Sequence, residues 1–114
     1  MDFRLTKQQE EIRRSVREMC EQYPDEYWRE LDRDRRYPEE FVEALTRSGW
    51  LSALIPEEYG GMGLGVTEAA IILEEINRSG ANAGACHAQM YTMGTLLRHG
   101  SEEQKRAYLP KIAA

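Results

Sequence analysis

The sequence predicts an all-α fold, a bundle-like arrangement of six helices without a substantial sheet. Apolar residues recur at spacings of three and four along most of the 114-residue chain, which is the period of an amphipathic helix. Helix-start signals stand in front of several of these segments, and the connections between segments are short. No segment gives a clear strand pattern, so helix-on-helix packing is the expected architecture.

The first helix is expected to begin after Thr6, which can form a capping box with Gln9. Its apolar stripe follows the helical period and predicts the buried face: Leu5, Ile12, Val16, Met19 and Cys20. The arginines at positions 13, 14 and 17 alternate with acidic residues. We therefore interpret them as a solvated face rather than a phosphate-binding patch.

Two prolines and a glycine delimit the next two helices. Pro24 and Pro38 are each followed by acidic residues, and both are expected at the first helical position, where a missing N–H costs nothing. Gly49 is expected just beyond the end of the third helix, where a left-handed residue commonly terminates a helix. Residues 51–55 allow a brief extended segment but do not predict a sheet.

Residues 55–66 form a glycine-rich stretch between two predicted helices. Apolar residues alternate with the glycines and predict an ordered loop held to the core: Ile55, Tyr59, Met62, Leu64 and Val66. Neither nucleotide-binding fingerprint is satisfied, because Val66 stands where a glycine is needed, no strand precedes, and no Lys-Ser/Thr pair follows.

Three further helices are expected in the second half of the chain. The fourth begins at Thr67 and is strongly apolar, with its charged residues expected outside: Glu68, Glu74, Glu75 and Arg78. Residues 79–82 end that helix and cap the fifth, which His99-Gly100 terminates. A capping box of Ser101 and Gln104 starts the sixth helix, which is expected to be interrupted near Pro110.

Composition excludes several function classes. The net charge of −5 argues against non-specific nucleic-acid binding, and no apolar run reaches the ~20 residues of a membrane span. Cys20 and Cys86 stand far apart in the sequence, so neither a disulfide framework nor a zinc site is suggested. With a charged N-terminus that does not resemble a signal peptide, a reduced, soluble, cytoplasmic protein of one domain is the expectation.

The segment 82–97 is the one place where the residues point to a binding surface. It is rich in Ala, Gly, Cys, Met and Thr, and five of its residues could form one surface: Ala85, Cys86, Gln89, Met90 and Met93. They would make an apolar wall with one polar group, as small-molecule sites often have, or an ordinary helix–helix core. Cys86 has no suitable base to act as a nucleophile, and His87 lacks the spacing of a di-iron motif.

Five segments carry a family resemblance: Tyr-Pro-Glu-Glu-Phe (37–41), Gly-Trp-Leu (49–51), Ile-Pro-Glu-Glu-Tyr-Gly-Gly-Met-Gly-Leu (55–64), Glu-Ala-Ala-Ile-Ile-Leu-Glu-Glu-Ile (68–76) and Ser-Glu-Glu-Gln-Lys-Arg-Ala-Tyr-Leu-Pro-Lys-Ile (101–112). With these segments, the chain resembles the acyl-CoA dehydrogenases over nearly its whole length. This resemblance implies an N-terminal helical domain, residues 1–114, of a flavoenzyme whose flavin-binding β-domain and C-terminal helical domain lie outside this chain.

The resemblance also implies a division of labour. The full-length enzyme would bind FAD and an acyl-CoA, remove hydrogens from its α and β carbons, pass electrons to a partner, and form a homo-oligomer. This chain would hold neither the catalytic base nor bound FAD and would be inert alone. It would contribute one wall of the acyl pocket through Ala85, Cys86, Gln89 and Met93. The alternative is a non-catalytic helical interaction or dimerisation module.

Overall fold

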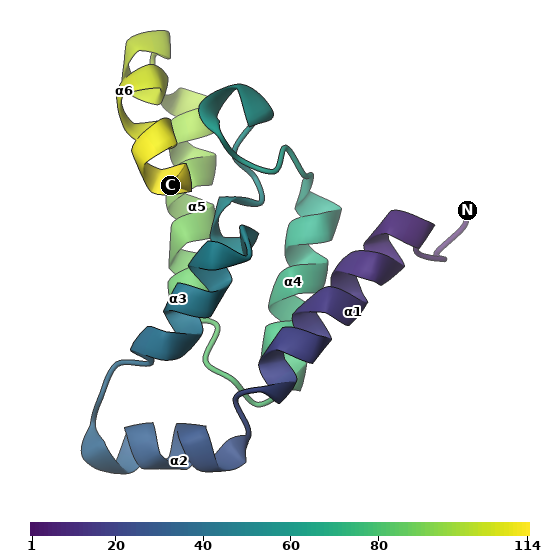
Figure 1. Cartoon of the computed structure of the whole chain (residues 1–114). Helices are drawn as coiled ribbons and strands as arrows, with labels where there is room; N and C mark the ends of the chain where they lie inside the picture. Colours follow the sequence, from purple (N-terminus) through teal and green to yellow (C-terminus); the bar gives the residue numbers. More distant parts are fainter.

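Six α-helices and two short 3₁₀ helices make up the chain, and no strand is present (Figure 1). The computed structural model describes all residues from 1 to 114. The elements are α1 (Lys7–Glu21), α2 (Asp25–Asp34), α3 (Glu39–Arg47), η1 (Trp50–Ser52), η2 (Glu57–Tyr59), α4 (Val66–Arg78), α5 (Gly84–His99) and α6 (Glu102–Ala113). The all-α, six-helix prediction is confirmed.

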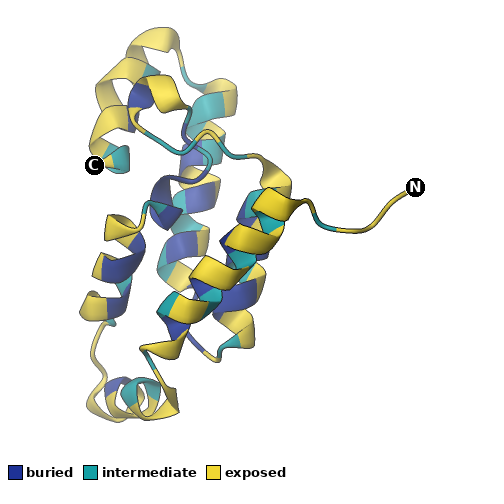
Figure 2. Ribbon diagram, turned by 45° about the vertical axis from the view of Figure 1, so that its right-hand side comes forward, coloured by how far each residue is buried: buried dark blue, intermediate teal, exposed yellow.

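The helices form two pairs with a cap at each end. Helix α1 packs along α4, and α5 contacts α3, α4 and α6 (Figure 1). Helix α2 crosses below the bundle, whereas α6 covers the C-terminal end of α5. In Figure 2 the buried faces of α1, α3, α4 and α5 turn toward one another, while α2 and α6 are largely exposed. None of the helices is both long and apolar enough to cross a membrane.

Local sequence signals set most helix ends as predicted. Both capping boxes form, with the hydroxyls of Thr6 and Ser101 accepting from the N–H of the third helical residue. Gly49 has φ +83°, the left-handed conformation expected beyond the end of α3. Pro24 and Pro38 lie one residue earlier than predicted, as N-caps, because their ψ angles of 173° and 66° are not helical.

The core has two parts. The larger contains sixteen buried residues from both helix pairs, among them the fully buried Val16, Phe41 and Ile72. The predicted stripe of α1 supplies Ile12, Val16 and Cys20 to it. The smaller part joins the loop to the last two helices through Ile55, Tyr59, Met93 and Leu109.

The glycine-rich stretch is an ordered loop, as predicted, except for one residue. It folds back on the segment before it, where the N–H of Gly63 donates to Ile55 O at 2.9 Å and that of Leu64 to Ala53 O at 2.8 Å. The possible extended segment at 51–55 is instead 3₁₀ helix and turn. Val66 was expected to anchor the loop but is 79% exposed, because it begins α4 on the side away from the core.

Two further predictions were wrong. Glu75 was expected outside but is 2% exposed, since Arg17 of α1 reaches across to it and replaces its hydration. Arg17 was predicted to lie on a solvated face, but this contact shows that it also pairs with a buried carboxylate. Helix α6 was expected to be interrupted near Pro110 but continues to Ala113. The proline forfeits a single backbone bond near the helix end, and the buried Leu109 beside it holds the turn in place.

Candidate functional site

A groove of about 370 Å³ runs along α5, where that helix faces α3, η1 and α6. Most of its lining is apolar, and none of it is charged. The lining residues are Tyr37, Val42, Leu51, Ala85, Ala88, Gln89, Thr92, Met93 and Ile112. A volume of this size lies within the range of small-molecule sites in proteins.

Three of the four residues predicted for a binding wall lie together in this groove. Ala85, Gln89 and Met93 are spaced four residues apart on α5, so their side chains stack along one face. Ala85 leaves space, whereas Met93 is fully buried and belongs to the smaller core cluster. The groove is therefore shaped by a small residue at one end and a firmly packed one at the other.

Gln89 gives the groove its fixed polar group. Its Nε2 donates a hydrogen bond of 3.0 Å to the backbone oxygen of Leu51 in η1. The bond spans the groove from one wall to the other and satisfies a carbonyl that the 3₁₀ turn leaves free. The side chain is thus held in one place rather than free to swing out of the groove.

The fourth predicted residue, Cys86, does not line the groove. Its side chain is fully buried in the larger core cluster, because one residue further along a helix rotates the side chain by about 100°. Burial raises the pKa of its thiol to about 11, so the thiolate is scarce at neutral pH. The neighbouring His87 is exposed and stacks edge-on against Tyr91, with ring centroids 5.4 Å apart.

The groove offers mainly apolar contacts to a bound molecule. It contains no carboxylate, imidazole or thiol that could serve as base or nucleophile. No group of three His, Cys, Asp or Glu side chains is arranged to hold a metal ion. Gln89 and Thr92 are the groove's polar side chains besides the phenol of Tyr37.

Comparison with known families identifies the chain. The family model for the acyl-CoA dehydrogenase N-terminal domain matches residues 6–114. The chain belongs to this family. The domain is 39% identical to the probable acyl-CoA dehydrogenase fadE25 of Mycobacterium leprae and 40% identical to the probable acyl-CoA dehydrogenase FadE25 of Mycobacterium tuberculosis. Each match covers 98% of this chain.

The matched region is a minority of each relative. The chain spans 29% of the length of both mycobacterial proteins. A chain in the solved structure described as the electron transferring flavoprotein of Acidaminococcus fermentans matches with a TM-score of 0.84 and 29% identity, covering 99% of this chain and 30% of that one. That chain therefore contains a region with the fold of this domain.

The family implies FAD in the full-length enzyme, but the groove of this acyl-CoA dehydrogenase N-terminal domain does not fit that cofactor. A flavin dinucleotide carries a pyrophosphate, which needs cationic side chains or a helix N-terminus opposite it. The groove offers no cationic side chain, since its lining is uncharged, and its residues on α5 run along the helix from Ala85 to Met93 rather than gathering at the helix N-terminus. No catalytic step can be assigned to FAD from the residues of this chain.

Sequence reasoning missed the opposite wall of the groove, formed by Tyr37, Val42, Leu51 and Ile112. These residues come from three separate segments that meet only in the folded chain, so no local period marks them. Ala88 and Thr92 on α5 were detectable in principle. They lie three residues beyond Ala85 and Gln89 and broaden the same helical face.

Proposed function

We propose that this chain is the N-terminal domain of a flavin-dependent acyl-CoA dehydrogenase and that its groove forms one wall of the acyl-chain site. The observation that carries the proposal is the uncharged, mostly apolar groove along α5 in a chain in which 31% of residues are charged. From Ser79 to Leu97 the sequence contains no charged residue at all. A helix face of this kind suits contact with a hydrocarbon chain.

In this proposal the chain's own residues bind and orient the substrate, and the rest of the enzyme performs the chemistry. FAD, when bound elsewhere, would supply the two-electron oxidation of the α and β carbons. Ala85 and Ala88 would let the acyl chain approach the α5 backbone. Each methylene removed from water there contributes about 0.8 kcal/mol to binding. Electron transfer to a partner and homo-oligomer formation would also belong to the complete protein.

The decisive experiment changes Gln89 in the full-length enzyme. Gln89→Ala removes the polar bridge to Leu51, which opens the groove, so we expect the preferred acyl-CoA to lengthen by about two carbons. The measurement is kcat/KM across a series of saturated acyl-CoAs of increasing length. Thr95→Ala, on the exposed face of α5 outside the groove, is the matched control and should leave the profile unchanged.

An identical chain-length profile for the wild type and Gln89→Ala would contradict the acyl-wall assignment. The isolated chain should show neither flavin absorbance nor reduction of an electron-accepting dye with acyl-CoA. A yellow, active chain would contradict the proposal that the cofactor and base lie in other domains.

A second candidate function is a non-catalytic interaction or dimerisation module. It is favoured by the exposed aromatic residues Tyr91 on α5 and Tyr108 on α6, which are 59% and 55% accessible. Under this alternative, the chain would form a discrete dimer that Tyr91→Lys disrupts, measured by light scattering after gel filtration. A product of the same gene containing the β-domain and C-terminal domain would argue for the enzyme instead.

A further inference from the structure

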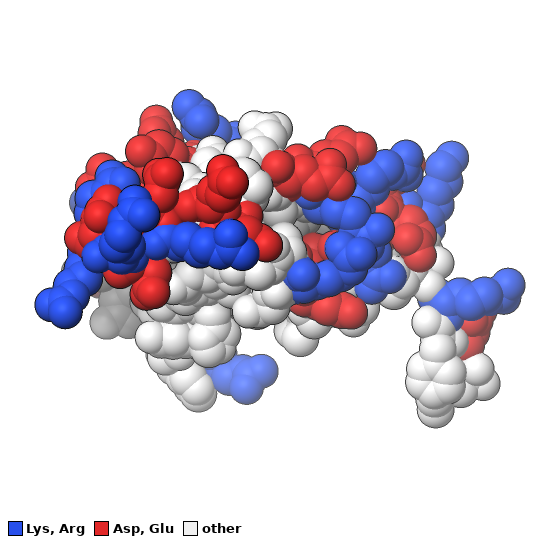
Figure 3. All heavy atoms as spheres, turned by 90° about the horizontal axis from the view of Figure 1, so that it is seen from below, with Lys and Arg blue, Asp and Glu red and all other residues white.

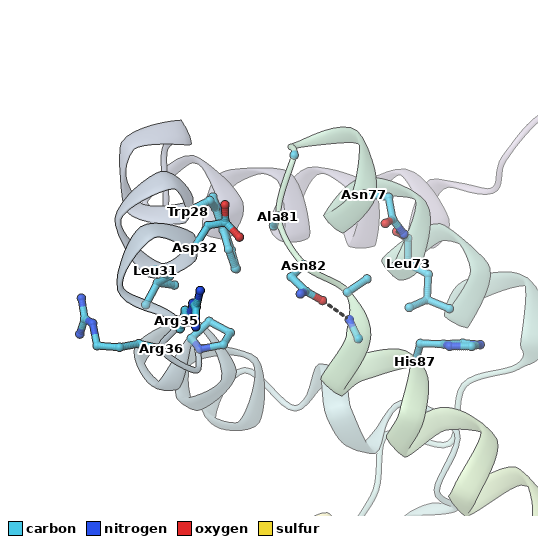
Figure 4. A pocket seen from close by; sticks show the side chains of 14 residues that line it. Trp28, Leu31, Asp32, Arg35, Arg36, Leu73, Asn77, Ala81, Asn82 and His87 are labelled. Atoms are coloured by element: carbon cyan, nitrogen blue, oxygen red, sulfur yellow. Dashed lines mark hydrogen bonds between the residues drawn. The ribbon is translucent and has the colours of Figure 1, made fainter.

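A second, larger groove of about 880 Å³ lies between α2 and the turn that joins α4 to α5 (Figure 4). One side is α2, with Trp28 and Arg35, and the other is α4 and the start of α5, with Asn77 and His87, while residues 80–84 run between the two sides (Figure 4). Leu73 of α4 forms part of the apolar lining. This groove is separate from the one that α5 forms with α3, η1 and α6, and the two share no lining residue.

Arg35 is the unpaired cation of this groove. The neighbouring arginines on and just after α2 are paired with acids, Arg29 with Asp25 and both Arg33 and Arg36 with Asp34. Figure 3, from below, shows the resulting mixture of positive and negative side chains over α2. Arg35 has no such partner, and in Figure 4 it lies on the side of α2 that faces Asn82 while Arg36 extends away.

The backbone at Arg35 is unusual. With φ 54° it is the only non-glycine residue of the chain at positive φ, and it occupies the position after α2 where glycine is normally preferred. The hydrogen bonds around it are those of a complete helix-ending motif, with Arg36 N–H donating to Leu31 O at 3.0 Å. Glycine would adopt this conformation without the cost that a side chain brings.

Two asparagines present complementary free groups to the same groove. Asn77 Nδ2 donates to Leu73 O at 2.8 Å, so its Oδ1 remains available as an acceptor. Asn82 Oδ1 accepts from Gly84 N–H at 2.8 Å, so its Nδ2 remains available as a donor. One donor and one acceptor are what a backbone peptide group requires.

We propose that this groove binds an extended peptide segment of a partner protein, one with a carboxylate close to an apolar side chain. The carboxylate would pair with Arg35, the peptide backbone would bond to Asn77 and Asn82, and the apolar side chain would cover Leu73. Asp32 is the only acidic residue in the lining and lies beside Trp28, so a carboxylate is excluded from that end of the groove. The charge arrangement therefore selects acidic peptides in one orientation.

The test uses the ¹⁵N-labelled chain and two blocked peptides, acetyl-Leu-Ala-Glu-amide and acetyl-Leu-Ala-Gln-amide, with sodium acetate as a third probe. Amide chemical shifts are followed during titration. We expect saturable shifts at residues 77–87 with the glutamate peptide and about tenfold weaker binding of the glutamine peptide, as a charge-assisted bond is lost.

Matched variants separate the role of Arg35 from loss of folding. Arg35→Gly relieves the positive φ, so it should raise the thermal midpoint while abolishing the preference for the glutamate peptide. Arg29→Gln, on the same helix but outside the groove, should keep that preference. Absence of saturable shifts, or equal binding of the two peptides, would overturn the proposal. Acetate alone reproducing every shift would reduce the groove to a simple anion site and overturn it as well.

Discussion

Replacing Glu75 by glutamine tests the most consequential polar contact in the fold. Glu75 of α4 is 2% exposed and receives two hydrogen bonds from Arg17 of α1, Nη2 to Oε1 at 2.9 Å and Nε to Oε2 at 3.1 Å. Arg13 and Arg78 stand farther off, at 3.4 and 3.9 Å. Since α1 packs along α4, this bidentate ion pair links the two helices of that pair.

The size of the effect follows from the geometry. Hydrogen bonds to a charged group contribute about 1.5–3 kcal/mol each, against about 1 kcal/mol for a neutral one. Glutamine keeps the shape and one acceptor, but turns an N–H toward the guanidinium. The Arg17 side chain is 42% exposed and regains water, which offsets part of the loss. We expect Glu75→Gln to lower the free energy of unfolding by about 2 kcal/mol.

Urea denaturation at pH 7, followed by far-ultraviolet circular dichroism, measures this loss. Glu74→Gln is the matched control: Glu74 is the preceding residue of the same helix but 66% exposed, so its change should stay within about 0.5 kcal/mol. Glu75→Gln in an Arg17→Gln background should cost much less than in the wild type. A loss for Glu75→Gln no larger than for Glu74→Gln would refute the reasoning.

Acidification tests the same pair independently. Hydrogen bonding from Arg17 lowers the pKa of Glu75 below its ordinary value of 4.5, although burial of the carboxyl acts in the opposite direction. A carboxyl with a lowered pKa in the folded state stabilises the fold fully above its unfolded value. That contribution is lost as the pH falls below about 4.5 and through the folded value. The Glu75→Gln variant should therefore lose less stability than the wild type between pH 5 and pH 3.

Two other features of the fold give sharp predictions. A Cβ at Gly61 would lie 2.1 Å from Ile55 O, so Gly61→Ala should destabilise the chain by about 3 kcal/mol in urea. A Cβ at Gly94 would meet nothing within 4 Å, so Gly94→Ala should stabilise α5 by up to about 1 kcal/mol. Equal changes in stability for the two variants would contradict the close approach of Gly61 to Ile55. Cys86, with a raised thiol pKa and no exposure, should react with a thiol reagent at pH 8 only as fast as the chain unfolds; rapid labelling of the native protein would show otherwise.

Features encoded within a single turn were predictable from the sequence. The capping boxes at Thr6 and Ser101 and the glycine after α3 depend only on residues three or four apart. The burial of Glu75 was not predictable, because its partner Arg17 lies 58 residues away in the sequence. Continuation of α6 past Pro110 likewise depends on Leu109 being buried by other segments.

The residues of the candidate site also differ in whether local spacing predicts them. The helical period of α5 was sufficient to place Ala85, Gln89 and Met93 on one face. The helical period did not place Cys86 correctly. Its side chain points away from that of the adjacent Ala85 and is buried in the larger core cluster. The wall opposite α5 required knowledge of which distant segments meet it, which no spacing rule supplies.

The glycine-rich loop affects the groove indirectly, through the segment that contains η1. Its close approach at Gly61, where no side chain fits, lets the loop bond back onto the segment after η1, as Leu64 N–H does to Ala53 O. That pairing fixes the turn that presents the Leu51 carbonyl, which in turn holds Gln89 across the groove. The loop thus carries no chemistry of its own, yet a residue with a side chain at Gly61 should disturb the groove as well as stability. A Gly61→Ala enzyme with reduced stability but an unaltered chain-length profile would show that the loop and groove are mechanically independent.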